Sequence, residues 1–200
     1  KHVLGNGSLL GLFSMMKMFP VIIALIFTPI LVKKTGSMQK VNFWGYVISD
    51  ILGIFLIIFA MQKNLPMMLL FMFLKGTFAG TMSGTLNALI AEISGYTYRT
   101  KGVHIDGMMF SCSSLGVKVG GGIGTAAVGW LLHAAGYAGK AATQTVAATN
   151  MIFSMYITIP VILGVVITIL LGLMKVEKEN KRIDMERAEQ AERGMKYAVS

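Results

Sequence analysis

The stretch MIFSMYITIPVILGVVITILLGLM, residues 151–174, decides the fold of this chain, because it carries no charged residue over its whole length. A transmembrane α-helix needs about 20 consecutive, mostly apolar residues to cross the roughly 30 Å hydrocarbon core of a bilayer. Four earlier stretches meet the same requirement, and charged or turn-forming residues separate them. The sequence therefore predicts an all-α bundle of about five membrane spans followed by a charged tail. The predicted spans are 9–32, 41–60, 66–90, 107–135 and 151–174, and the tail is 175–200.

The composition agrees with a membrane protein. Of the 200 residues, 54% are hydrophobic and 14% are charged, whereas a soluble domain has about 45–50% apolar and 25% charged residues. The net charge is +9, but the basic residues of the apolar body lie in short breaks or alone within spans. A nucleic-acid-binding patch needs clustered basic residues, so no nucleic-acid partner is expected. The single Cys112 excludes an internal disulfide and a cysteine-based metal site.

The distribution of Lys and Arg predicts the orientation. Twelve lie on one side of the membrane, in the first break, in the polar break 92–104 and in the tail, and three lie on the other side. Cytoplasmic loops are enriched in Lys and Arg, so the tail is predicted to be cytoplasmic in a bacterial inner membrane. It is expected to be a solvated helix, with a regulatory or partner-binding role as the alternative. The three residues on the other side are Lys1, Lys63 and Lys140.

The number of spans has a consequence for the domain organisation. Five spans that begin in mid-loop leave the N-terminus outside the membrane on this orientation. We therefore expect the chain to be a C-terminal piece of a longer transporter, whose missing N-terminal half is its partner along with membrane lipid.

Four ionisable residues lie well inside the predicted spans. A charge near the bilayer centre costs about 2.5–3.5 kcal/mol, so such residues are functional or paired by default. At about 1.5 Å per residue, Lys75, Asp50 and Lys118 lie near the midplane and Lys17 lies nearer the outside. Three lysines outnumber one carboxylate. Either their partners belong to the missing half, or a structural Lys–Asp pair forms, or the lysines line water. We expect Lys118, Lys75 and Asp50 to couple transport to a cation.

Polar residues share helix faces with these charges. Ser83 and Asn87 are four positions apart, as are Ser114 and Lys118, with Ser113 adjacent. Such hydroxyl and amide groups either bind a sugar or water in a cavity, or form hydrogen bonds between helices. The first alternative makes Ser83, Asn87, Ser113 and Ser114 the candidate substrate-binding residues.

Five closely spaced glycines mark the fourth span. Small residues let helices approach closely, so we expect packing positions here, and no strand precedes them as a phosphate-binding loop requires. His104 and His133 have no second ligand at metal-binding spacing, so no metal site is expected. The glycines are Gly116, Gly120, Gly121, Gly122 and Gly124.

A series of motifs runs from the third span to the end of the fourth. Residues 91–96 read AEISGY and 100–107 read TKGVHIDG; an FS pair at 110–111, Lys118 and GWLL at 129–132 follow. Their order resembles the C-terminal half of the glycoside–pentoside–hexuronide:cation symporters. This is the melibiose-permease-like branch of the major facilitator superfamily. The resemblance covers nearly the whole apolar body, as helices eight to twelve.

The resemblance implies a secondary transporter that carries a sugar, glycoside or uronide together with Na⁺ or H⁺ and needs no other cofactor. It implies that Lys118 lies near the cation site and that Ser113 and Ser114 lie near the sugar. Ser83 matches a sugar-facing position that is aromatic in melibiose-permease-like proteins, so the substrate need not be a galactoside.

The chain departs from the family pattern in the polar break. The family shows Asp, Arg and Glu where this chain has Glu92, His104 and Asp106, which bears on the ion pairs at the cytoplasmic end. We expect these three residues, together with Arg99, to form a cytoplasmic gate whose contacts change during transport.

Two other functions stay open on the sequence. A proton-coupled efflux transporter of the same superfamily would favour an aromatic-rich cavity, and only two Trp are present. A non-transport membrane scaffold gains nothing from deep lysines. An enzyme is not expected, because no nucleophile–base pair or metal constellation is present.

Overall fold

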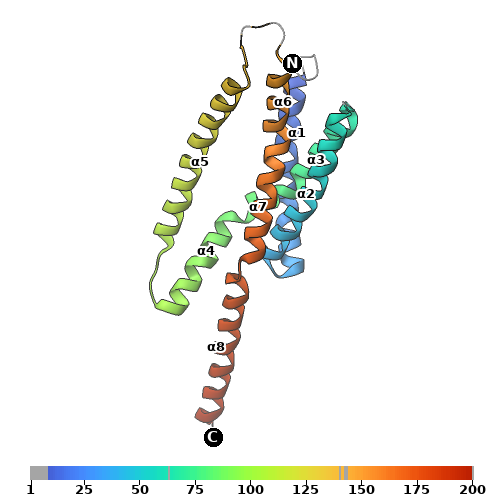
Figure 1. Ribbon diagram of the computed structural model, residues 1–200. Coiled ribbons are helices and arrows are strands. Elements are labelled where there is room, and N and C mark those ends of the chain that lie inside the picture. Colours follow the sequence, from blue (N-terminus) through green and yellow to red (C-terminus); the bar gives the residue numbers. More distant parts are fainter. Residues whose placement is uncertain (1–8, 63, 140, 142–143, 200) are drawn as a thin grey trace.

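The computed structural model describes residues 9–62, 64–139, 141 and 144–199, and every regular element within these ranges is a helix (Figure 1). Lys1, Lys63 and Lys140, used above for the orientation, lie outside the described residues. The elements in chain order are α1 (Leu9–Thr35), α2 (Met38–Met61), α3 (Leu65–Ala79), α4 (Thr81–Lys101), α5 (Asp106–Ala134), α6 (Val146–Phe153), the π-helix η1 (Ser154–Thr158), α7 (Ile159–Leu173) and α8 (Val176–Val199).

Five helical stretches within these ranges are long and apolar enough to cross a membrane. They confirm the all-α bundle of about five spans. The third joins α3 and α4, and the fifth joins α6, η1 and α7 and runs on into the charged α8, which lies beyond the apolar segment. The stretches are Met15–Thr35, Met38–Met61, Leu65–Lys101, Asp106–Ala134 and Val146–Ala191.

Local sequence signals set the ends of the first helices. Gly36 follows α1 with a φ of +63°, a left-handed conformation that glycine adopts without strain. Ser37 then caps α2, because its side chain accepts a hydrogen bond from the backbone nitrogen of Lys40 at 3.1 Å. Asn64 caps α3, and Pro66 occupies the first turn, where no N–H is needed.

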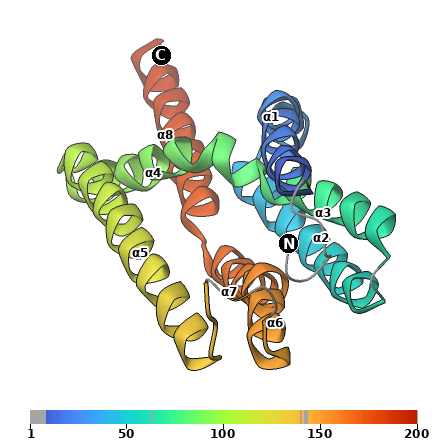
Figure 2. The same cartoon turned by 90° about the horizontal axis from the view of Figure 1, so that it is seen from above.

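The third span is broken at Gly80. A Cβ at this position would lie 2.7 Å from the Cβ of Ala24, so α1 passes directly over the break. Beyond it, α4 continues to Lys101 and ends at Gly102, whose φ is +69°. The break predicted over 92–104 is therefore helical for most of its length. In both views, α3 and α4 together pass from one side of the molecule to the other (Figures 1 and 2).

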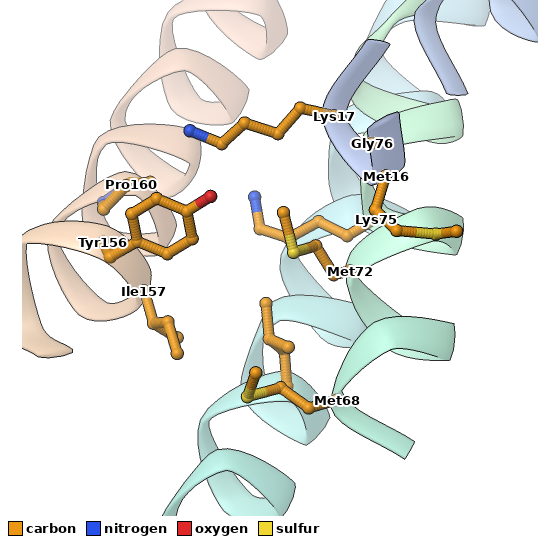
Figure 3. A pocket seen from close by; sticks show the side chains of 10 residues that line it. Met16, Lys17, Met68, Met72, Lys75, Gly76, Tyr156, Ile157 and Pro160 are labelled. Carbon is orange, nitrogen blue, oxygen red and sulfur yellow. The ribbon is translucent and has the colours of Figure 1, made fainter. Parts of the chain in front are cut away.

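The last span contains a π-helical turn before Pro160. Proline has no N–H to donate to the carbonyl four residues earlier, and the wider turn of η1 accommodates this loss. Such turns recur at functional sites. Here the π-helix carries Tyr156 on the side that faces α1 and α3 (Figure 3).

Close packing joins α1, α2, α3, α4 and α7. A Cβ at Gly45 would lie 2.8 Å from Oγ1 of Thr81, which brings α2 and α4 together. Nearby, the buried Asn42 donates from Nδ2 to Oγ1 of Thr85 at 2.6 Å. Close packing at small residues and hydrogen bonds between helices are the interactions that hold helices together in a bilayer.

Helix α5 stands apart from this bundle, as both views show (Figures 1 and 2). None of its residues is buried in the described structure. Nothing lies within 4 Å of a Cβ built at any of its clustered glycines. The close packing expected at these glycines therefore does not occur within the described residues.

The tail differs from the solvated helix that its charge pattern predicts. Helix α8 extends beyond the bundle (Figure 1), but its first turns pack on α4 and Glu177 accepts a hydrogen bond from Gln39 of α2. Glu177 and Asn180 are buried to 6% and 3% exposure respectively, which a free helix would not show.

Candidate functional site

A cavity of about 190 Å³ lies among α1, α2, α3 and the π-helical turn before α7. Methionine and aliphatic side chains form most of its wall, and Lys17, Lys75 and Tyr156 are the polar or charged side chains in it. Lys75 is predicted to lie near the midplane of its span. The cavity therefore lies inside the membrane-spanning part of the molecule.

Two ammonium groups share this cavity. Figure 3 shows the Nζ atoms of Lys17 and Lys75 directed into the same space, with the hydroxyl of Tyr156 facing them from the opposite wall. The Nζ atom of Lys17 lies 4.3 Å from the ring centroid of Tyr156, within the distance of a cation–π interaction. In the described part of the chain, neither lysine forms an ion pair with a carboxylate within 4.0 Å.

Lys75 and Asp50 are neighbours without a direct ion pair. The side chain of Lys75 crosses Gly53, where a Cβ would lie 3.1 Å from its Cε. Asp50 precedes Gly53 by about one turn of α2 but is directed toward α7. There its Oδ2 accepts a hydrogen bond of 2.6 Å from Oγ1 of Thr168, and a Cβ at Gly164 would collide with its Oδ1. The contacts of Asp50 therefore tie α2 to α7.

The third residue predicted for cation coupling lies elsewhere. Lys118 is exposed on α5, with Ser114 exposed and Ser113 partly buried on the same helix. Because α5 packs only on α4 and α6 to any extent in the described structure, these residues are not brought together with Asp50 and Lys75. Their roles stay predictions.

Ser83 and Asn87 lie on the exposed face of α4. The opposite face of the helix is buried and carries Thr81, Thr85 and Leu89. The two candidate residues therefore face away from the packed side of α4. Of the four proposed substrate-binding residues, Ser113 is partly buried and the other three are exposed, and none of them lines the cavity.

The predicted gate residues lie at one end of the molecule. Nη1 of Arg99 lies 3.0 Å from Oδ2 of Asp184 in α8, and the backbone carbonyl of Glu92 accepts from Nδ2 of Asn180 at 3.0 Å. His104 and Asp106 lie at ion-pair distance, 3.7 Å, with both side chains exposed. The structure thus gives two of the four residues partners in the tail.

Glu177 connects the tail helix to the start of α2. Its carboxylate accepts from the backbone nitrogen of Gln39 at 2.8 Å and lies 3.1 Å from Nζ of Lys181. Burial alone would raise the pKa of Glu177, but the hydrogen bonds from Gln39 and from Ser37, together with Lys181, hold this pKa below its usual range. The residue is therefore a charged anchor between α8 and the start of α2.

Sequence reasoning missed several of these residues. It identified Lys17 as a deep charge without assigning it to a site, and it did not identify Tyr156. It also did not identify Asn180 and Asp184 as partners of the gate. The one usable signal was an aromatic residue with a hydroxyl, Tyr156, four positions before Pro160. No group of acids, histidines and cysteines in the described residues is arranged to hold a metal ion.

Comparisons with known proteins give a consistent result. The family described as MFS/sugar transport protein matches residues 1–178. A putative glycoside/cation symporter of Escherichia coli (strain K12), YagG, is 29% identical over 109 residues, which are 52% of this chain and 24% of that protein. The isoprimeverose transporter of Lactiplantibacillus pentosus is 34% identical over 99 residues, 50% of this chain and 20% of that protein.

A third relative is an uncharacterized 29.9 kDa protein of Pseudescherichia vulneris. It is 27% identical over 132 residues, 65% of this chain and 48% of that protein. The chain thus spans less than half the length of each of these relatives. No solved structure is significantly similar to the chain.

Proposed function

Because the chain belongs to the MFS/sugar transport protein family, we propose that the whole protein is a secondary transporter that carries a sugar, glycoside or uronide together with Na⁺ or H⁺. The family match and the symporter-named relatives confirm the resemblance of the motifs to the glycoside–pentoside–hexuronide:cation symporters. The family is one of transporters and not of enzymes, as the sequence predicts. The five spans make the chain a multi-pass membrane protein.

The cavity with Lys17 and Lys75 is the observation that carries the proposal. Two ammonium groups inside the bundle, without carboxylates in ion-pair contact, are costly in a bilayer unless they face water, a ligand or an incoming acid. A transporter supplies all three in turn, because its central site is open alternately to the two sides. A scaffold would need none of them.

In this mechanism the chain is one of two halves that rock about a midplane site. Lys118 would pair with a carboxylate of the other half, and occupancy by the cation would weaken that pair. Exposed α5, with Ser113 and Ser114, and the exposed Ser83 and Asn87 of α4 would then face the substrate pathway. Glu92, Arg99, His104 and Asp106 would make and break contacts at the cytoplasmic end, in the bacterial inner membrane.

The proposal is tested by transport into vesicles. Full-length protein is reconstituted, an inward gradient of Na⁺ or H⁺ is imposed, and uptake of labelled pentosides, hexosides and hexuronates is measured. We expect accumulation of at least one of them only when a gradient is present. Lys118→Ala should reduce the accumulation about 5- to 150-fold, which corresponds to typical coupling free energies of about 1–3 kcal/mol. The control Lys101→Ala, at an exposed position, should retain it.

Three outcomes would count against the proposal. Uptake of none of these substrates under either gradient would contradict sugar symport. Export of hydrophobic dyes that is driven by a proton gradient would support the efflux alternative. Undiminished accumulation by Lys118→Ala would remove this residue from coupling.

A further inference from the structure

A second cavity, of about 480 Å³, lies where the bundle meets the tail. The start of α2, the end of α7 and the first turns of α8 form its walls. Nε2 of Gln39 donates to the carbonyl of Leu171 at 2.9 Å and also to the carbonyl of Met174. The backbone nitrogen of Gln39 donates to Glu177. One residue therefore ties all three walls together, so the cavity is preformed.

The cavity is strongly basic. Lys40, Lys175 and Lys178 line it and are exposed. Among the described residues, no carboxylate forms an ion pair with any of them within 4.0 Å. The one acid in the wall, Glu177, is already compensated by Lys181. Three cations are thus left without a counter-ion at one site.

Beside these charged residues and the polar Ser37 and Gln39, the wall has an apolar part at the ends of the membrane-spanning helices. Phe43 of α2 and Gly172 of α7 lie together, since a Cβ at Gly172 would lie 3.1 Å from the Phe43 ring. Leu171, buried to 3% exposure, completes this side. The cavity therefore combines an apolar part formed by α2 and α7 with cations from the start of α2 and from the tail.

We propose that this cavity binds the phosphate headgroup of an anionic phospholipid from the leaflet on the tail side, with an acyl chain along Phe43 and Gly172. A phospholipid has the same division into an anionic and an apolar part, and basic pockets between helices at a membrane surface bind such headgroups. A free phosphate would match the lysines but would leave the apolar side in water. The site shares no lining residue with the Lys17–Lys75 cavity.

The test measures lipid bound to full-length protein. The protein is purified in a neutral detergent and titrated with phosphatidylglycerol or phosphatidylcholine, and bound lipid is counted by native mass spectrometry. The triple variant Lys40→Gln, Lys175→Gln, Lys178→Gln should bind phosphatidylglycerol about a hundredfold more weakly. The control triple Lys33→Gln, Lys34→Gln, Lys101→Gln removes the same charge outside the cavity. It should bind within about threefold of wild type, because these lysines lie at greater distance from the headgroup.

Two further measurements distinguish a lipid headgroup from a free phosphate compound. Phosphatidylcholine should bind more weakly than phosphatidylglycerol and equally to all three proteins. Millimolar glycerol 3-phosphate should not displace the lipid. Equal loss in both triple variants, equal affinity for the two lipids, or displacement by glycerol 3-phosphate would each overturn the proposal. If the triple variant does not fold, Lys175→Gln and Lys178→Gln alone, each at an exposed position, should each weaken binding about fivefold; an unchanged affinity in both would also overturn it.

Discussion

Asp50 shows how one polar residue is held in an apolar bundle. It is 8% exposed, its Oδ2 accepts from Thr168, and its Oδ1 has no hydrogen-bond partner in the described structure. In lipid, polar groups must find partners within the protein. The Thr168 hydroxyl is therefore the contact on which the position of this carboxyl depends, and through it the packing of α2 on α7.

Removal of this hydroxyl should be destabilising. Thr168→Val keeps the shape of the side chain but leaves a buried carboxyl without its donor, so we expect a loss of about 1–3 kcal/mol in the free energy of unfolding. Thr168→Ser retains the hydroxyl and is the matched control. Reversible unfolding of the full-length protein in mixed micelles measures both, and equal stabilities of the two variants would contradict the role of the hydrogen bond.

At the scale of the helices, the break at Gly80 decides how the third span crosses the bundle. The glycine lets α1 approach so closely that a Cβ would lie 2.7 Å from the Cβ of Ala24 and 3.3 Å from the Cα of Val21. A residue with any side chain has to push α1 away at this point. On the same span, Gly95 has nothing within 4 Å of its Cβ position.

These two glycines give a matched pair of substitutions. Gly80→Ala should destabilise the protein by about 1–3 kcal/mol through overpacking. Gly95→Ala should be neutral or stabilise it by about 0.5–1 kcal/mol, because alanine loses less backbone entropy in a helix. Thermal unfolding of the full-length variants distinguishes them. A stable Gly80→Ala variant would show that α1 does not lie as close to α4 as described.

The contacts of the tail helix α8 also differ from what its own sequence predicts. Its mixed charges predicted a solvated helix, but two acids and one amide form specific contacts: Glu177 with the start of α2, Asn180 with the Glu92 carbonyl and Asp184 with Arg99. No spacing rule within the tail points to these contacts, because every partner lies on another helix more than 80 residues away.

For the whole molecule, the exposed helix α5 is the one membrane span without a buried residue in the described structure. Its glycines are aligned every four residues at Gly116, Gly120 and Gly124, and in the described structure nothing lies within 4 Å of a Cβ built at any of them. The relatives are longer than the stretch that this chain matches. We therefore expect helices of the other half of the transporter to pack on this face.

A bulky residue on the glycine face should be harmful in the full-length protein. Gly120→Ile is expected to destabilise it by about 1–3 kcal/mol and to lower transport, because the helices of the other half would have to move apart. Leu115→Phe, at a position that is 61% exposed and on the side of α5 away from these glycines, adds bulk there and should change stability by less than about 1 kcal/mol. If Gly120→Ile unfolds and transports as wild type does, this face is in contact with lipid and not with protein.

The sequence by itself determined the class, the number of spans and the family. Span length and hydropathy are local properties, which each apolar run shows without its neighbours, and the order of the motifs from residue 91 to residue 132 is likewise readable along the chain. It also placed Lys75 and Asp50 deep in their spans. It did not place them relative to each other, since depth fixes height along a helix but not the direction of a side chain.

The tertiary structure alone decided which faces meet. It brought Lys17 of α1, Lys75 of α3 and Tyr156 of the π-turn to one cavity, directed Asp50 toward Thr168 instead of Lys75, and left Lys118 apart on α5. The shared cavity depends on close approach at Gly53 and Gly80, and the position of Asp50 depends on close approach at Gly164. Close approach is a property of two complementary surfaces from distant parts of the chain, and no single segment contains it.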